Sequence, residues 1–142
     1  MTAIAFDKAP VVSTDRAPKG VWAGRVLSGI AVLFLAWDAA MKLLMVQPVL
    51  ETNAALGYSV GAIRPIGFIE LACLALYVVP RTAVVGAVLW TGYLGGAIAT
   101  HVRVDSPLLS HTLFPIYVAA LLWGGLFLRD PRVRALLLSR PR

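Results

Sequence analysis

Four long apolar segments dominate the sequence and limit how the chain can fold. They cover about residues 22–47, 62–79, 82–102 and 107–128. A helix needs roughly 20 apolar residues, with a range of about 17–25, to cross the hydrocarbon core of a bilayer. Every segment is long enough, and none shows the alternation of apolar and polar residues that membrane barrel strands require. The sequence therefore predicts an all-α protein, an integral membrane four-helix bundle.

The composition agrees with a location in the bilayer. The chain is 59% hydrophobic and 14% charged, whereas soluble domains are about 45–50% apolar and about 25% charged. Its net charge of +6 is compatible with nucleic-acid binding, but the basic residues flank the apolar segments and form no soluble basic face. We therefore expect contact with the lipid bilayer and none with nucleic acid.

Residues that favour turns divide the chain into a membrane domain and two tails. The expected parts are an N-terminal tail (1–21), a membrane domain (22–130) and a basic C-terminal tail (131–142). Asp7 and Asp15 interrupt the N-terminal tail, which is therefore no signal peptide and is expected to be disordered. Pro115, inside the fourth segment, is expected to kink that helix.

The distribution of Lys and Arg predicts the orientation in the membrane. Ten of the 13 basic residues lie before or at the start of the first segment, between the second and third, or after the fourth, with Arg25 counted at the start of the first segment. In a four-span chain these positions share one side, and basic residues favour the cytoplasm. Both termini are therefore predicted to be cytoplasmic, in a bacterial-type plasma (inner) membrane, with the connections 48–61 and 103–106 facing outward.

Three hydrogen-bonding side chains fall at one depth in the predicted bundle. At about 1.5 Å per residue, Glu70, Tyr93 and Tyr117 lie roughly 15–16 Å from the cytoplasmic boundary. A charged group near the bilayer midplane costs on the order of 3 kcal/mol, so it normally faces the bundle interior. Glu70 is therefore expected to face the other helices and to find a partner there.

A second set of polar residues falls nearer the outer surface. Asp38 and Lys42 are four residues apart, share a helix face and are expected to pair. We interpret both sets as a polar pocket that opens outward and has the three deeper side chains as its floor. The alternative is a buried hydrogen-bond network that fixes helix register. For Asp38 and Lys42 we favour a structural pair, and for Arg64 an anchor at the membrane interface. In the pocket interpretation, the mouth consists of Asp38, Lys42, Arg64, His101 and His111.

Other motifs are sparse. His101 and His111 could bind a metal with Asp105, but their spacing matches no recognised motif, so no metal site is predicted. Cys73 is the only cysteine, which excludes a dithiol–disulfide exchanger made by this chain alone. No cofactor motif is evident, although a lipophilic cofactor such as a quinone has no fixed sequence signature.

Small residues in the third and fourth segments indicate close helix contacts. Gly92 and Gly96 form a G-x-x-x-G pattern, and Gly124 is followed by Gly125. Such residues allow helix backbones to approach one another. We interpret them as packing positions within the bundle in preference to a dimer face, and the pattern leaves the oligomeric state open.

Three stretches resemble the DoxX-like family of small four-helix membrane proteins. They are GRVLSGIAVLFLAWDAAMKLL (24–44), LGYSVGAIRPIGFIELACLALYVVPRTAVVGAVLWTGYLGGAIATHVRV (56–104) and LLWGGLFLRDPRVRALL (121–137). The resemblance covers about residues 22–138. The family is named for a membrane subunit of an archaeal thiosulfate:quinone oxidoreductase, and other members are linked to redox and oxidative-stress complexes. The resemblance implies a redox association, and it transfers no catalytic residue.

Together these features favour a non-catalytic membrane subunit or binding protein. It would hold a lipophilic molecule such as a quinone, or support a membrane or redox partner protein. Two alternatives stay open. One is an enzyme acting on a membrane-dissolved substrate with Glu70 as general acid or base. The other is a small oligomeric transporter or proton path in which Glu70 carries the proton.

Overall fold

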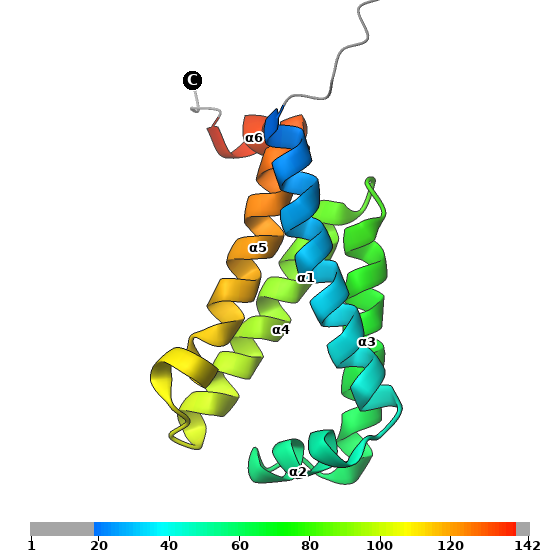
Figure 1. Cartoon of the computed structure of the whole chain (residues 1–142), viewed down its shortest axis with the longest axis vertical. Helices are drawn as coiled ribbons and strands as arrows, with labels where there is room; N and C mark the ends of the chain where they lie inside the picture. Colours follow the sequence, from blue (N-terminus) through cyan, green and yellow to red (C-terminus); the bar gives the residue numbers. More distant parts are fainter. Residues whose placement is uncertain (1–18, 139–142) are drawn as a thin grey trace, which may run out of the picture.

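The computed structural model describes residues 19–138, which form helices and contain no strand. Figure 1 shows that both ends of this part of the chain lie at the same end of the molecule. The expected disorder of the N-terminal tail falls mostly on residues 1–18, outside the described residues. The last residues of the expected C-terminal tail, 139–142, lie outside them as well.

Four helices are long and apolar enough to cross a membrane, which confirms the four predicted spans. The first three are α1 (Lys19–Leu43), α3 (Val60–Val78) and α4 (Ala83–Arg103). The fourth span consists of a π-helical turn, η1 (Leu108–Thr112), followed by α5 (Phe114–Arg129). The chain also forms two shorter helices, α2 (Gln47–Ala55) and α6 (Pro131–Leu138), where a connection and a tail were expected.

Local backbone chemistry explains where α2 begins and ends. The α1 helix ends at Leu43, about four residues before the predicted boundary at residue 47. Met45, with a positive φ of 54°, has left the helical conformation. Pro48 lies in the first turn of α2, where its missing N–H and fixed φ are well suited. Gly57, with a φ of 82°, reverses the chain after α2 in a conformation that glycine adopts without steric strain.

Pro115 acts differently from the kink that was expected. It lies in the first turn of α5 and is buried, so the helix loses no internal hydrogen bond at this residue. The irregularity precedes it, because η1 ends at Thr112 and Leu113 separates it from α5. The fourth span is therefore interrupted at Leu113, before Pro115.

The four long helices form a ring in which α1 and α4 each pack against α3 and α5. They approach one another at the end that carries the termini and spread apart toward the other end, where α2 lies crosswise (Figure 1). Glycines permit the close contacts. A Cβ on Gly24 would lie 2.8 Å from the backbone of α5, and a Cβ on Gly86 would overlap the backbone at Tyr77.

Tyr77 ties three of the long helices together in the tightly packed half of the bundle. Its side chain on α3 is fully buried, and its hydroxyl donates a hydrogen bond of 2.7 Å to the Leu122 carbonyl oxygen of α5. The same hydroxyl lies 3.1 Å from the Ser28 Oγ of α1. Ala87 and Trp90 of α4 are buried in the same core.

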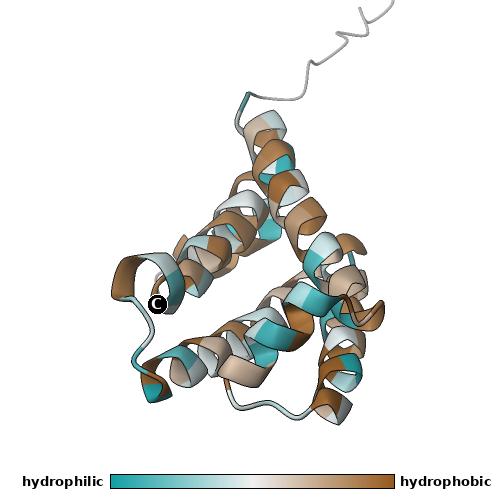
Figure 2. Cartoon of the chain, turned by 60° about the horizontal axis from the view of Figure 1, so that its bottom comes forward, coloured by the Kyte–Doolittle hydropathy of each residue, from teal (hydrophilic) through white to brown (hydrophobic). Residues whose placement is uncertain are grey.

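The outer surface of the bundle is largely apolar. Leu33, Trp37 and Phe68 are among the large apolar side chains that are more than half exposed. Figure 2 shows hydrophilic residues only as short patches along the long helices. Such a surface is expected where lipid, and not water, surrounds a helix. The length of the helices and their surface both identify a multi-pass membrane protein.

Candidate functional site

A cavity of about 670 Å³ opens in the half of the bundle that carries α2. Binding sites for small molecules usually measure about 300–1,000 Å³ and have mostly apolar walls with a few polar groups. Every element from α1 to α5 contributes to the lining. The apolar part of the wall includes Phe34, Leu35, Ile66, Ile69, Leu94, Phe114 and Val118.

A cluster of four polar side chains lies beside this cavity and joins three helices. The Lys42 ammonium of α1 donates a hydrogen bond of 2.6 Å to Glu70 Oε1 of α3. It also forms an ion pair with Asp38, one helical turn earlier on α1. The Tyr93 hydroxyl of α4 donates to the same Glu70 oxygen. We call Asp38, Lys42, Glu70 and Tyr93 the polar cluster.

The members of the polar cluster differ in solvent exposure, from the fully buried Glu70 to the partly exposed Asp38. Glu70 is 0% exposed and is absent from the cavity wall, whereas Asp38, Lys42 and Tyr93 all line the cavity. The Asp38 side chain is 38% exposed. This corrects the expectation that Glu70 forms the pocket floor, because Glu70 lies behind Lys42 and Tyr93. Its carboxylate positions them from the buried side.

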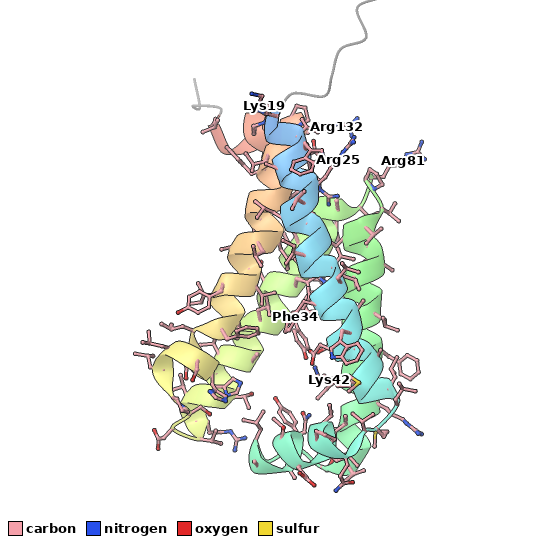
Figure 3. The ribbon with its side chains drawn as sticks, in the orientation of Figure 1. Lys19, Arg25, Phe34, Lys42, Arg81 and Arg132 are labelled. Atoms are coloured by element: carbon pink, nitrogen blue, oxygen red, sulfur yellow. The ribbon has the colours of Figure 1, made fainter. Side chains whose placement is uncertain are left out.

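The cluster offers both hydrogen-bond donors and acceptors to the cavity. An ammonium has three N–H donors, and Asp38 and Glu70 occupy two of those of Lys42. The third N–H, the oxygen of Tyr93 and the free lone pairs of Asp38 are available to a ligand. Figure 3 shows Lys42 and Phe34 on the inner side of α1, facing the space bounded by the long helices and α2.

Tyr117 does not join the other two residues of the predicted floor. Its side chain is 49% exposed, and it is absent from the cavity wall. The helical phase of α5 explains this, because Val118 and Leu122 supply the buried stripe. With 3.6 residues per turn, the residue before Val118 points about 100° away from that stripe. The spacing along the sequence predicts a depth for Tyr117 but not the direction of its side chain.

The residues expected at the mouth divide into two groups. His101 and His111 both line the cavity, with ring centroids 5.8 Å apart in an edge-to-face arrangement. Their Nδ1 atoms lie 3.0 Å from Ser106 Oγ and 2.8 Å from Ser110 Oγ. Arg64 is exposed and does not line the cavity. Residues 19–138 contain no group of three or more His, Cys, Asp or Glu side chains suited to a metal.

Several features of the site were not apparent from the sequence. The α2 helix supplies Val49, Thr52 and Asn53 to the cavity wall, although its sequence was interpreted as a connection. Tyr58 and Thr100 share a hydrogen bond of 2.9 Å that holds the chain after α2 against α4. Neither contact has a signal in the sequence, because both depend on how α2 folds back under the bundle.

Gly92 and Gly96 have a different role from the one expected. They were interpreted as packing positions, but a Cβ on either would meet nothing within 4 Å. Both line the cavity instead. Gly125 does pack closely, since an added Cβ would lie 2.8 Å from the Ser28 backbone nitrogen. Small residues thus provide close contact in one half of the bundle and open space in the other.

Comparison with known proteins identifies the family. No curated protein and no solved structure matches this chain. The model of the DoxX-like family matches residues 26–125, which is most of the 142-residue chain. The matched range contains all four members of the polar cluster and both histidines at the cavity. The protein is therefore a multi-pass membrane protein that belongs to the DoxX-like family.

Proposed function

We propose that this protein is a non-catalytic membrane protein that binds a lipophilic molecule with a polar ring, of the quinone type, inside its helical bundle. The observation that carries this proposal is the apolar cavity with Asp38, Lys42 and Tyr93 on its wall. A lipophilic molecule would leave the bilayer for the apolar wall, and its polar group would pair with the cluster.

The donors and acceptors of the cluster suit both redox forms of a quinone. The Lys42 ammonium would donate to a quinone carbonyl oxygen. In the reduced form, a quinol hydroxyl would donate to Asp38 or to the oxygen of Tyr93. Glu70 supports this arrangement from behind, because its Oε1 accepts from both Lys42 and Tyr93. The ligand itself would carry the electrons, and a membrane or redox partner protein would exchange them with it.

Filling the cavity should remove quinone binding. We expect the double substitution Gly92→Leu/Gly96→Leu to weaken binding of a short-chain benzoquinone by at least about tenfold, or 1.4 kcal/mol. Both positions line the cavity and have open space for a side chain. Equilibrium dialysis of the detergent-purified protein measures this directly.

A matched double variant controls for the loss of two glycines. Gly61 and Gly95 also have open space around a Cβ, but neither lines the cavity. Gly61→Leu/Gly95→Leu should therefore bind the benzoquinone as the wild type does. Equal binding by wild type and both double variants would show that the cavity is not the binding site.

Glu70→Gln separates a binding role from the catalytic and proton-carrying alternatives. The glutamine oxygen can still accept from Tyr93 and Lys42, and Lys42 keeps its ion pair with Asp38. We therefore expect benzoquinone affinity to change by less than about threefold, within the range of one hydrogen bond. Glu70→Ala, which removes the acceptor, should bind more weakly. A turnover or proton-uptake activity abolished by Glu70→Gln would instead favour the alternatives.

The proposed location is a bacterial-type plasma (inner) membrane with both termini in the cytoplasm. Arg25, Arg81 and Arg132 lie at the end of the molecule that carries Lys19 and the termini (Figure 3), as the positive-inside rule requires of a cytoplasmic end. Reporter fusions after Glu51 and at the C-terminus should report opposite sides of the membrane. The same side for both fusions would overturn this orientation.

A further inference from the structure

A second pocket lies at the other end of the bundle, far from α2. It has a volume of about 420 Å³ and is separate from the cavity beside the polar cluster. Its wall comes from the first part of α1, the turn between α3 and α4, the end of α5 and the start of α6. We call it the arginine pocket, because its lining includes Arg25, Arg81, Arg129 and Arg132.

The arginine pocket holds an excess of positive charge. The lining carries four arginines and one carboxylate, Asp130, which gives a formal charge of 4 − 1 = +3 when arginine stays protonated. Asp130 accepts a hydrogen bond of 2.9 Å from the Arg132 backbone N–H and forms no ion pair with an arginine of the described part of the chain. Within residues 19–138, the two ion pairs both involve the Lys42 ammonium. Among residues 19–138, these guanidinium groups therefore form no ion pair with a carboxylate.

One of the four arginines is held in place by the core. The guanidinium of Arg129 lies over the Tyr77 ring at 5.0 Å from its centroid and is 3.4 Å from the Tyr77 carbonyl oxygen. Its Nε is buried and has no hydrogen-bond partner in the described chain. A fixed guanidinium with unused donors loses little conformational entropy when an anion binds.

The rest of the wall and its surroundings are apolar. Pro80, Ala83 and Leu126 complete the lining. Trp22, which is 68% exposed, lies three residues before Arg25 on α1, so the two occupy neighbouring faces of the helix. Aromatic residues of this kind favour the level of the lipid head groups. The pocket thus combines cationic groups with an apolar wall where the long helices meet the membrane surface.

We propose that the arginine pocket binds the phosphate group of an anionic phospholipid. Guanidinium groups bind phosphate oxygens through paired, charge-assisted hydrogen bonds. Basic pockets between membrane helices on the cytoplasmic side are suited to anionic head groups. Free inorganic phosphate has the same recognition chemistry, but it would not use the apolar wall that a lipid's acyl chains contact.

The test compares two double variants that lose the same charge. Arg25→Gln/Arg132→Gln removes two exposed arginines of the pocket and keeps Arg129, which supports the core. Lys19→Gln/Arg64→Gln removes two exposed basic residues that do not line the pocket. Delipidated protein in neutral detergent is titrated with phosphatidylglycerol, with phosphatidylcholine, or with inorganic phosphate. Native mass spectrometry counts bound lipid, a thermal-shift assay follows phosphate, and circular dichroism verifies helix content.

The wild type should bind one phosphatidylglycerol in preference to phosphatidylcholine. Each arginine near an anionic head group contributes about fivefold in affinity, so the pocket variant should bind about 30-fold more weakly. The control variant should match the wild type. If inorganic phosphate stabilises the wild type but not the pocket variant, and phosphatidylglycerol does not bind, the pocket binds free phosphate and the lipid assignment is wrong. Equal phosphatidylglycerol binding by both variants, or no preference over phosphatidylcholine, would overturn the proposal.

If the double variant loses helix content, Arg81→Gln replaces it. Arg81 is exposed in the turn between α3 and α4, where a change of side chain leaves the helices intact. This single variant should bind phosphatidylglycerol about fivefold more weakly than the wild type. Unchanged binding in that variant would contradict the proposal. None of these measurements involves the cavity beside the polar cluster, so the outcome is independent of the proposed quinone binding.

Discussion

Lys42→Met is expected to lower the free energy of unfolding by about 3–5 kcal/mol, the range for breaking a buried ion pair on one side. The reason is Glu70, which is 0% exposed and has Lys42 as its only cationic partner among the described residues. Without the ammonium, a carboxylate stays deep in the bundle with only the Tyr93 hydroxyl to stabilise it. Unfolding by SDS in mixed micelles, followed by circular dichroism, measures the loss.

A second variant distinguishes an unpaired charge from lost packing. Lys42→Met/Glu70→Gln removes both charges and keeps an acceptor for Tyr93, so it should recover most of the lost stability. Asp38 needs no replacement partner, because its side chain is 38% exposed. Lys19→Met, at an exposed position, should change stability by less than about 0.5 kcal/mol. A double variant no more stable than Lys42→Met would contradict the role assigned to the ion pair.

Gly125→Ala is expected to destabilise the bundle by about 1–3 kcal/mol, the usual range for overpacking. An added Cβ would overlap the Ser28 Oγ and would lie 3.0 Å from the Gly24 carbonyl oxygen. Relief requires α1 and α5 to move apart, because backbone atoms of α1 are among those contacted. The same SDS unfolding experiment applies.

The neighbouring glycine supplies the control for this prediction. A Cβ on Gly124 would meet nothing within 4 Å, and alanine favours a helix over glycine by about 1 kcal/mol. Gly124→Ala should therefore leave the bundle as stable as the wild type or stabilise it. Only Gly125→Ala should lower the free energy of unfolding, although the two positions are adjacent. Equal effects would show that α1 and α5 do not approach each other closely at Gly125.

The four membrane helices could be predicted because they depend on local composition. A run of about 20 apolar residues identifies a span without knowledge of its neighbours. The α2 helix could not be predicted in this way. It is nine residues long, too short to be stable alone, and it contacts α3 and α1 in the folded chain. Its residues carry turn signals that also suit a helix with Pro48 in its first turn.

The polar cluster could be predicted only in part. The pairing of Asp38 with Lys42 follows from their spacing within one helix, and the structure confirms it. The contact between Lys42 and Glu70 joins α1 to α3, and its geometry depends on how those helices are rotated. For the same reason Tyr93 reaches Glu70, whereas Tyr117 faces away from the cavity. Depth along a helix can be read from the sequence, but rotation requires the packed structure.

The most direct test of the proposed function is the identity of the molecule that copurifies with the protein. The protein would be extracted from its native membrane in mild detergent, and its bound small molecules would be identified by mass spectrometry. We expect a stoichiometric quinone in the wild type and in Gly61→Leu/Gly95→Leu, and its loss in Gly92→Leu/Gly96→Leu. Only bulk phospholipid in all three proteins would contradict quinone binding and leave the polar cluster as a structural network.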